Sequence, residues 1–229
     1  MALAASPKDG GRGLERDMVV TAALQLLDEV GFNGLTQRRL AERLNVKAAA
    51  LYWHFENKQD LIDAVAERIM LTEFKHDPSQ ATDWRSLLTT VAHVHRRALM
   101  RYRDGAEVMA HANLRNHTMF EGLESLLKVL REQGFTAPQA MHSFFAIIRF
   151  TLGCVFEEQA DPHPKSATPA ERRQRITEMA KDYPTVAQGI ADTMAGKGRD
   201  YMFECGLRII LDGIAQQIEK PLDPAHNLA

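Results

Sequence analysis

Apolar residues recur every three or four positions along almost the whole chain, and this spacing constrains the fold more than any other feature. The segments 84–102 and 137–159 show it most clearly, because each carries an apolar stripe over several helical turns. No stretch alternates apolar and polar residues convincingly, as a half-buried strand does. We therefore expect an all-α protein, with helices near residues 15–30, 37–44, 48–54, 56–74, 84–102, 117–133, 137–159, 172–181, 184–195 and 200–219.

Composition limits the partners of such a chain. Its 229 residues can bury a core in a small domain joined to a larger one. The formal net charge of −2 argues against attraction of the whole molecule to nucleic acid or membrane, so such binding would need a local basic patch. No signal peptide or membrane-spanning run is evident, and Cys154 and Cys205 both lie in apolar helical patterns. We expect a soluble, cytoplasmic protein without disulfides.

Residues 35–58, LTQRRLAERLNVKAAALYWHFENK, contain two short helical patterns separated by a tight turn. Ala41 is small where the two helices would cross, and Asn45 tolerates the positive φ that the turn requires. The residues expected to bury this pair against the first helix are Leu40, Leu44, Val46, Leu51 and Phe55. This spacing is that of a helix-turn-helix, although an ordinary helical hairpin with a solvated charge run has the same spacing.

The outward side of this pair has the chemistry of a DNA-binding surface. Its basic residues are Arg38, Arg39, Arg43, Lys47 and Lys58, opposed by Glu42 and Glu56. They make the stretch locally positive, as phosphate contact requires. The three alanines at 48–50 let the backbone approach base edges and offer methyl groups to thymine, while Tyr52 and His54 can reach phosphates.

The pattern LT.RRLAERL.V....LYWHF.NK.DL resembles the DNA-binding domain of the TetR family of transcriptional regulators. Further along, YRDGAEV, LREQGF, FTLGCVFEEQ and GLRIILDGIAQQIE are similar to segments of the tetracycline-repressor subgroup. The resemblance implies a repressor that binds palindromic double-stranded operator DNA as a homodimer. A small-molecule effector in the larger domain would release it, and no membrane is involved.

The same resemblance implies a division of the chain and a set of DNA contacts. The expected segments are a flexible N-terminus at 1–13, a helix-turn-helix domain at 14–59, an effector-binding and dimerisation domain at 60–220 and a tail at 221–229. Arg38 would contact guanine and Lys58 a phosphate. The predicted DNA-binding residues are Thr36, Gln37, Arg38, Lys47, Ala48, Ala49, Ala50, Tyr52, Trp53, His54 and Lys58.

The effector site implied by the subgroup has lost several polar residues in this chain. Val91, His95, Met109 and Leu126 stand where the subgroup has asparagine, phenylalanine, a magnesium-binding histidine and glutamine. A one-residue insertion nearby leaves His111 as an alternative for the magnesium position. The predicted effector-binding residues are Phe74, Val91, His95, Met109, Leu126, Arg149 and Glu157, of which Glu157 retains a metal-associated acid.

These changes favour an effector other than magnesium-bound tetracycline, because first-shell coordination would be weak without an imidazole at Met109. We expect a largely hydrophobic molecule with one anionic or hydroxyl-rich end, which Arg149 would meet unless it only pairs with Glu157 or Glu158. No cofactor is predicted, and magnesium accompanying the effector is the alternative.

Two further expectations concern the last helices and the histidines. The apolar stripes of these helices are wider than one packed face per helix requires, which favours a four-helix dimer bundle. The residues predicted for this interface are Phe144, Ile148, Leu152, Val155, Leu207, Ile210, Leu211 and Ile214. The alternative function is a helical metal-dependent enzyme that uses the histidines at 93, 95, 111 and 117. No motif of a nucleotide-binding loop, a nucleophile elbow or a zinc-protease helix supports an enzyme.

Overall fold

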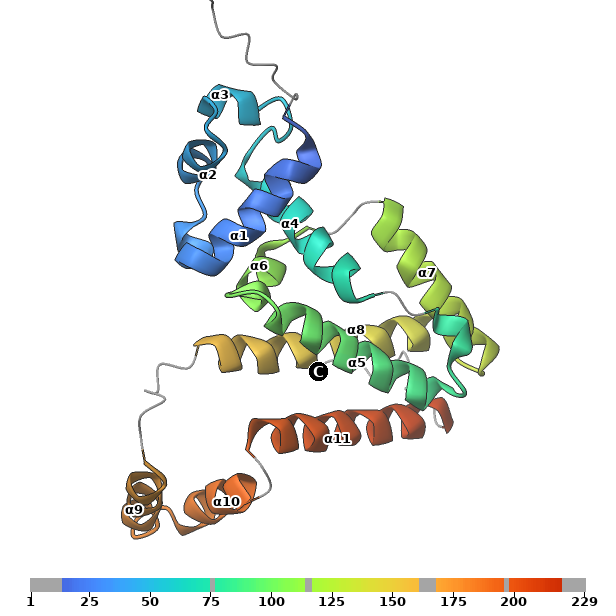
Figure 1. Ribbon diagram of the computed structural model, residues 1–229. Helices are drawn as coiled ribbons and strands as arrows, with labels where there is room; N and C mark the ends of the chain where they lie inside the picture. The colour runs from blue at the N-terminus through green and yellow to red at the C-terminus, as the bar shows by residue number, and fades with distance from the viewer. Residues whose placement is uncertain (1–13, 75–76, 114–116, 161–167, 196–197, 220–229) are drawn as a thin grey trace, which may run out of the picture.

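The computed structural model describes residues 14–74, 77–113, 117–160, 168–195 and 198–219, and over these ranges it is helical with no strand (Figure 1). This confirms the all-α expectation. A small N-terminal domain lies at one end, a larger helical domain follows, and helix α4 passes from the first into the second. The expected terminal segments at 1–13 and 221–229 lie outside the described residues.

The N-terminal domain contains α1 (Arg16–Gly34), α2 (Gln37–Leu44) and α3 (Ala48–Leu51). Thr36 begins α2, since its side chain accepts a hydrogen bond from the backbone N–H of Arg39. Asn45 has a φ of 52° and turns the chain into α3, as its place in the sequence predicts. The helix-turn-helix is therefore present.

Helix α3 is shorter than the expected 48–54. It ends at Leu51, whose carbonyl accepts hydrogen bonds from the backbone N–H groups of both His54 and Phe55. This tight turn brings Phe55 back into the core, where only 2% of its surface is exposed. The burial of the Phe55 ring therefore ends the helix at Leu51, although the alanines before it favour a longer helix.

Helix α4 (Lys58–Glu73) leads to a 3-10 turn, η1 (Pro78–Gln80), and then to the long α5 (Trp84–Met100). A short helix, α6 (Gly105–His111), follows a left-handed turn at Asp104, and the sequence did not indicate it. Seven residues are too few to show a helical stripe, which explains the omission.

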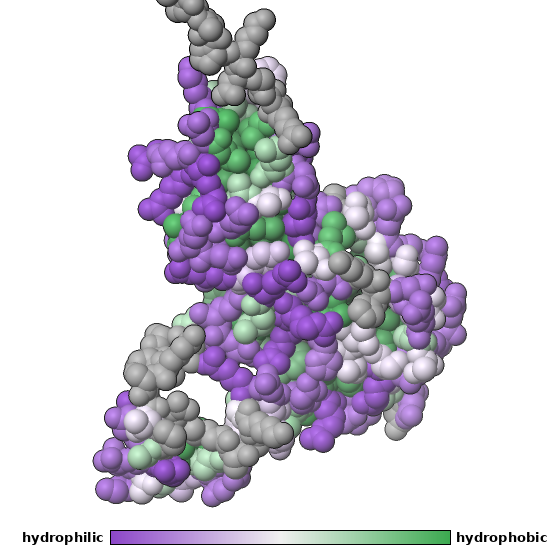
Figure 2. Space-filling view, in the orientation of Figure 1, coloured by the Kyte–Doolittle hydropathy of each residue, from purple (hydrophilic) through white to green (hydrophobic). Residues whose placement is uncertain are grey.

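The remaining helices are α7 (His117–Glu132), α8 (Ala137–Ala160), α9 (Pro169–Met179), α10 (Pro184–Ala195) and α11 (Arg199–Glu219). Helix α8 packs against both α5 and α11, so its apolar length serves the fold, although it alone among the described helices is long and apolar enough to cross a membrane. Helices α9 and α10 pack on each other and lie apart from the rest of the subunit (Figures 1 and 2).

Two apolar clusters form the core. The first joins α1–α4 with Leu99 of α5, Val108 of α6 and Val155 of α8. The second joins α5, α7, α8 and α11 around residues such as Leu88 and Phe203. Because the first cluster crosses from the DNA-binding helices into the larger domain, a shift of α6 or α8 changes the packing beneath α1 and α4.

Candidate DNA-binding surface and effector cavity

Helix α3 and the turn after it present an exposed surface. Ala48 and Ala49 are exposed, and Trp53 has 89% of its surface exposed. Leu51, between them, is buried and fixes the orientation of this segment. An indole that no part of the described chain covers suits contact with another molecule, since burial of a tryptophan in an interface removes a large apolar area from water.

Three predicted cations are exposed on this side of the domain. Lys47 is exposed, and Lys58 lies at the start of α4 with its Nζ 5.4 Å from the Phe32 ring centroid. Arg38 has its Nε 3.6 Å from Glu42 Oε1, but both side chains are largely exposed. Such a pair is weak, so Arg38 can exchange Glu42 for a base or phosphate.

Two other arginines serve the domain itself, which corrects the expected size of the basic patch. Arg43 Nη1 donates to both carboxylate oxygens of Glu29, at 2.9 and 2.7 Å, and its Nη2 donates to Gln25. Arg39 Nη1 lies 3.4 Å from the carbonyl oxygen of Gly34. These contacts tie α2 to α1, so Arg43 is not a free phosphate ligand.

The other predicted DNA-binding residues differ in exposure. Thr36 caps α2, and the Nε2 of Gln37 is buried with no partner among the described residues. Tyr52 is exposed, whereas His54 and Ala50 are half-buried. The predicted set lies on α2 with its cap, on α3 with its cap and the turn after it, and at the start of α4, while the contacts of each residue with DNA stay predictions.

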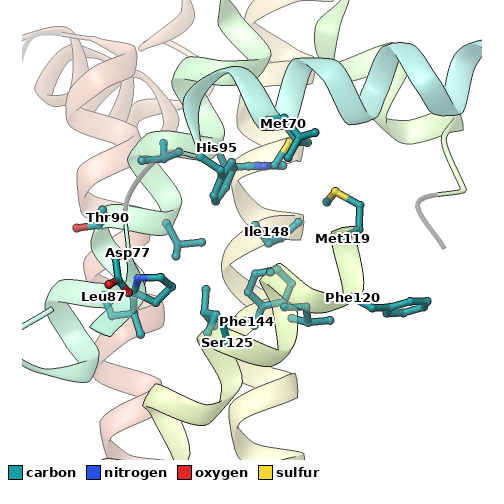
Figure 3. Close-up of a pocket in the computed structure, with 18 of the residues that line it drawn as sticks. Met70, Asp77, Leu87, Thr90, His95, Met119, Phe120, Ser125, Phe144 and Ile148 are labelled. Carbon is teal, nitrogen blue, oxygen red and sulfur yellow. The ribbon is translucent and has the colours of Figure 1, made fainter. Parts of the chain in front are cut away.

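A cavity of about 670 Å³, partly open to solvent, lies beneath α4 and is lined by residues of α4–α8 and of η1 and its flanks (Figure 3). We call it the α4 cavity. Five of the seven predicted effector-binding residues line it, namely Phe74, Val91, His95, Met109 and Leu126. Leu126 was the one residue of α7 that the sequence pointed to. Met119, Leu123 and Ser125 of α7 also line the cavity, and the helical spacing of Met119 and Leu123 with Leu126 was a usable signal.

Arg149 and Glu157 do not line the α4 cavity, which corrects the predicted lining. Successive residues of a helix point about 100° apart, so Ile148 faces the cavity while Arg149 is turned outward. The Arg149 guanidinium lies 4.9 Å from the Phe145 ring centroid, and Glu157 is exposed further along α8. Glu158 pairs with Arg96 rather than with Arg149. No lysine or arginine among the described residues lines the cavity.

His95 is the most deeply buried polar side chain of the cavity wall. Only 1% of its surface is exposed, and neither ring nitrogen has a hydrogen-bond partner in the described part of the chain. Burial lowers the pKa of His95 from 6.5 to about 4, because the charged ring would lose its hydration. The ring is therefore neutral at physiological pH.

The wall of the α4 cavity does not fit magnesium. Mg²⁺ prefers oxygen ligands in near-octahedral geometry, whereas Met109 offers only a thioether in the expected position. His111, the alternative, lies outside the cavity, where it stacks on Phe32 at 4.7 Å between ring centroids. His95 and Asp77 are the histidine and acidic side chains of the described lining, and no group of three histidine, cysteine or acidic side chains that could hold a metal occurs in the described ranges.

The histidines also do not form the cluster that the enzyme alternative needs. His93 lies 3.5 Å from Glu204, and His117 lies 3.2 Å from Glu121 on its own helix. His111 Nδ1 lies 2.9 Å from the carbonyl oxygen of Glu107. The four rings thus serve four separate environments, which favours the DNA-binding function over a metal-dependent enzyme.

Four of the eight residues predicted for the dimer interface are buried within the subunit, which corrects the assignment for these four, while the other four stay a prediction. Val155, Leu207, Leu211 and Ile214 are buried, Phe144 and Ile148 line the α4 cavity, and Leu152 and Ile210 are half-buried against the two core clusters. Within the subunit, α8 packs against α5, α6, α7 and α11, and α11 packs against α5, α8 and α10. Apolar side chains left exposed on α8 and α11 are Phe156, Tyr201, Met202 and Ile209, the last with 71% of its surface exposed.

The α4 cavity and the DNA-binding surface are connected through α4 and α6. Met109 of α6 lines the cavity, and two residues later the carbonyl of His111 accepts a hydrogen bond of 2.7 Å from Gln59 Nε2. Gln59 follows Lys58 at the start of α4. The end of α4 near Phe74 forms another wall of the cavity, so both helices lead from cavity to DNA-binding surface.

Comparisons with known proteins agree with this arrangement. The family described as "Bacterial regulatory proteins, tetR family" matches residues 19–65, and "Tetracyclin repressor-like, C-terminal domain" matches residues 77–218. The chain is 42% identical over 205 residues to the tetracycline repressor protein class C of Escherichia coli, covering 88% of this chain and 90% of that protein.

Solved structures show the same likeness. A glutamine-to-alanine variant of TetR from Acinetobacter baumannii AYE, in complex with minocycline, is 31% identical with a TM-score of 0.77 and covers 93% of this chain and 100% of that chain. TetR class A in complex with anhydrotetracycline and magnesium is 38% identical with a TM-score of 0.64, covering 89% of this chain and 99% of that chain.

Proposed function

The chain belongs to the tetR family of bacterial regulatory proteins and is a ligand-responsive transcriptional repressor, and we propose that its homodimer binds a palindromic operator until a small molecule occupies the α4 cavity. One observation carries this proposal. Helix α4 has Lys58 at its DNA-binding end and Leu71 and Phe74 in the cavity wall at its other end. The protein would act in the cytoplasm, where it meets its operator.

Release of the operator follows from the geometry of a dimer. Two recognition helices that enter successive major grooves must lie about 34–36 Å apart, the length of one turn of DNA. A ligand that displaces the cavity end of α4 changes the position of Lys58 in each subunit and hence this separation. A ligand that binds the displaced arrangement about 100-fold more tightly weakens operator binding by up to the same factor.

On the DNA side, the proposed roles follow exposure and chemistry. Arg38 reads guanine through its planar guanidinium, and Lys58 binds a phosphate. Ala48 and Ala49 face thymine methyl groups, because an exposed alanine lets the backbone approach the floor of the major groove. Trp53, the most exposed aromatic residue of the described chain, packs against the sugar-phosphate backbone beside them.

We propose that the effector is an aromatic small molecule bound without magnesium. The two solved relatives hold minocycline, or anhydrotetracycline with magnesium, and a cavity of about 670 Å³ can enclose a molecule of comparable size. The thioether of Met109 and the absence of a three-residue metal site in the described ranges support binding without the metal.

Fluorescence anisotropy with DNA from the region upstream of the protein's own gene tests the function. We expect saturable binding at nanomolar to micromolar protein, with one dimer per palindrome, and loss of binding when one half-site is scrambled. The control fragment has the same length and base composition. A protein that bound both fragments equally, or neither at micromolar concentration, would not be an operator-specific repressor.

A further inference from the structure

His95 is a buried polar side chain that makes no hydrogen bond through its ring within the described chain. Its ring lies beside Met70 in the upper wall of the α4 cavity, across from Ile148 and Met119 (Figure 3). Both ring nitrogens lack partners among the described residues. An unpaired buried polar group destabilises the folded chain, whereas phenylalanine would fill the same place without this loss. A role in ligand binding accounts for a histidine here.

The ring offers a ligand two different hydrogen-bonding groups. Because burial holds the pKa of His95 at about 4, the neutral imidazole has one N–H donor and one acceptor nitrogen. A neutral ring attracts a carboxylate much less than an imidazolium does, and it forms good hydrogen bonds with ketone and hydroxyl oxygens. The protonation state thus favours a ligand that is itself uncharged.

The rest of the wall points to the same ligand class. It is mainly aliphatic, aromatic and thioether in character, and Asp77 at the η1 end is the single charged side chain of the described lining. An anion would lie in the same cavity as this carboxylate without any cation to oppose it. A cation would leave most of its own surface against apolar groups, which costs its hydration.

From these observations, and resting on the proposed function of the α4 cavity, we infer that the effector is an uncharged, mainly apolar aromatic compound whose carbonyl or hydroxyl oxygen hydrogen-bonds to His95, without a divalent metal. His95 is then the residue that determines specificity for oxygenated over purely hydrocarbon ligands. Val91 and Leu126 supply apolar contact on the neighbouring walls.

Prodan tests this inference because it is an uncharged naphthalene with one ketone oxygen, and a hydrogen bond to that oxygen shifts its fluorescence to longer wavelength. The full-length protein is titrated with prodan in EDTA and again with excess magnesium. We expect one saturable site per subunit in both buffers. His95→Phe should weaken binding about tenfold and shift the emission of bound prodan to shorter wavelength, as loss of one hydrogen bond requires.

His93→Phe is the matched control, because it changes another histidine of α5 that lies outside the cavity lining. It should leave both affinity and emission unchanged. His95→Ala provides a second variant, in which affinity and emission should change in the same direction as in His95→Phe. Operator binding by each variant shows that it is folded.

Acetylnaphthalene and naphthoate, used as competitors, test the charge requirement, since they share a ring system and differ in ketone against carboxylate. We expect acetylnaphthalene to displace prodan at a concentration at least about tenfold lower. The inference is overturned if prodan does not bind in EDTA, if it needs magnesium, if His95→Phe changes nothing, or if naphthoate competes equally well. If operator DNA is bound in any of these cases, the repressor function stands and only the ligand class is wrong.

Discussion

The carboxylate of Asp104 accepts a hydrogen bond from the backbone N–H of Phe32, with 2.9 Å between Oδ2 and N, and this contact joins the turn before α6 to the end of α1. Next to it, the backbone N–H of Arg103 donates to Asp28 Oδ1 at 2.8 Å. Gly31 allows the close approach, since a Cβ on it would lie 2.5 Å from Asp104 Oδ2. The two domains are therefore joined by hydrogen bonds from backbone N–H groups to two carboxylates, and these bonds fix the turn before α6 against α1.

Gly31→Ala tests how much stability this junction supplies. Gly31 has φ 73° and ψ 176°, a conformation that residues with a Cβ avoid at a cost of about 1–3 kcal/mol, and the new methyl group would also displace Asp104. We expect at least this loss in the free energy of unfolding, measured by urea denaturation. Gly189→Ala on α10, where nothing lies within 4 Å of the added atom, should be neutral or slightly stabilising. Equal losses in both variants would contradict the strained junction.

The pH dependence of stability tests the state of His95. Its pKa is about 4 when folded and 6.5 when exposed, so between these values the unfolded chain binds more protons. Stability therefore falls as pH falls from about 6.5 towards 4. When the pH falls from 7 to 5.5, we expect the free energy of unfolding of His95→Phe to decrease by about 1 kcal/mol less per subunit than that of the unmodified protein. His93→Phe should keep the full dependence, and a pH profile unaltered by His95→Phe would mean that this ring is already solvated.

Two substitutions on the DNA-binding surface separate base reading from phosphate binding. Arg38→Ala should cost about 1–3 kcal/mol on the operator and relax the preference at one base pair of each half-site. Lys58→Ala should weaken binding to all sequences similarly and reduce the salt dependence by about one counterion per subunit. Titrations at several salt concentrations with half-site variants measure both effects. The same salt slope and sequence profile for the two variants would refute the assignment.

Ile209→Asp tests where the dimer forms. Ile209 is a large aliphatic side chain on the outer face of α11, and a carboxylate there would lose its hydration in a dimer interface. We expect the dimer dissociation constant to rise about 100-fold or more, so that sedimentation at micromolar concentration shows a species of 25.7 kDa. Met18→Asp, an exposed position on α1, should leave the dimer intact. An unchanged dimer in Ile209→Asp would place the interface elsewhere.

Helical spacing in the sequence was sufficient for the long helices and for the helix-turn-helix, because caps and turn residues such as Thr36 and Asn45 act locally. It was insufficient for α6, which has too few turns for a periodic signal, and for the end of α3, which the burial of Phe55 decides. Local patterns determine a helix, whereas its limits depend on distant contacts.

The lining of the α4 cavity was predictable where a residue of this chain could be matched to one pocket position of the tetracycline-repressor subgroup. Phe74, Val91, His95, Met109 and Leu126 line it together, but Arg149 does not, because a rotation of one residue along α8 separates it from Ile148. The dimer assignment was wrong for Val155, Leu207, Leu211 and Ile214 for a related reason. Periodicity shows which residues share a face of α8 or α11, but it does not show whether that face meets the same subunit or its partner.

The empty hydrogen-bonding capacity of His95 gives a route to the natural ligand that needs no knowledge of the operator. A compound that fills the α4 cavity binds the folded chain and not the unfolded chain. At a free concentration of a hundred times its dissociation constant, it adds about 2.7 kcal/mol to the free energy of unfolding. For a chain of this length that raises the melting temperature by roughly 5–10 °C. Compounds that lose this thermal shift in His95→Phe would report the histidine directly, so a metabolite library can be sorted by calorimetry before any target gene is known.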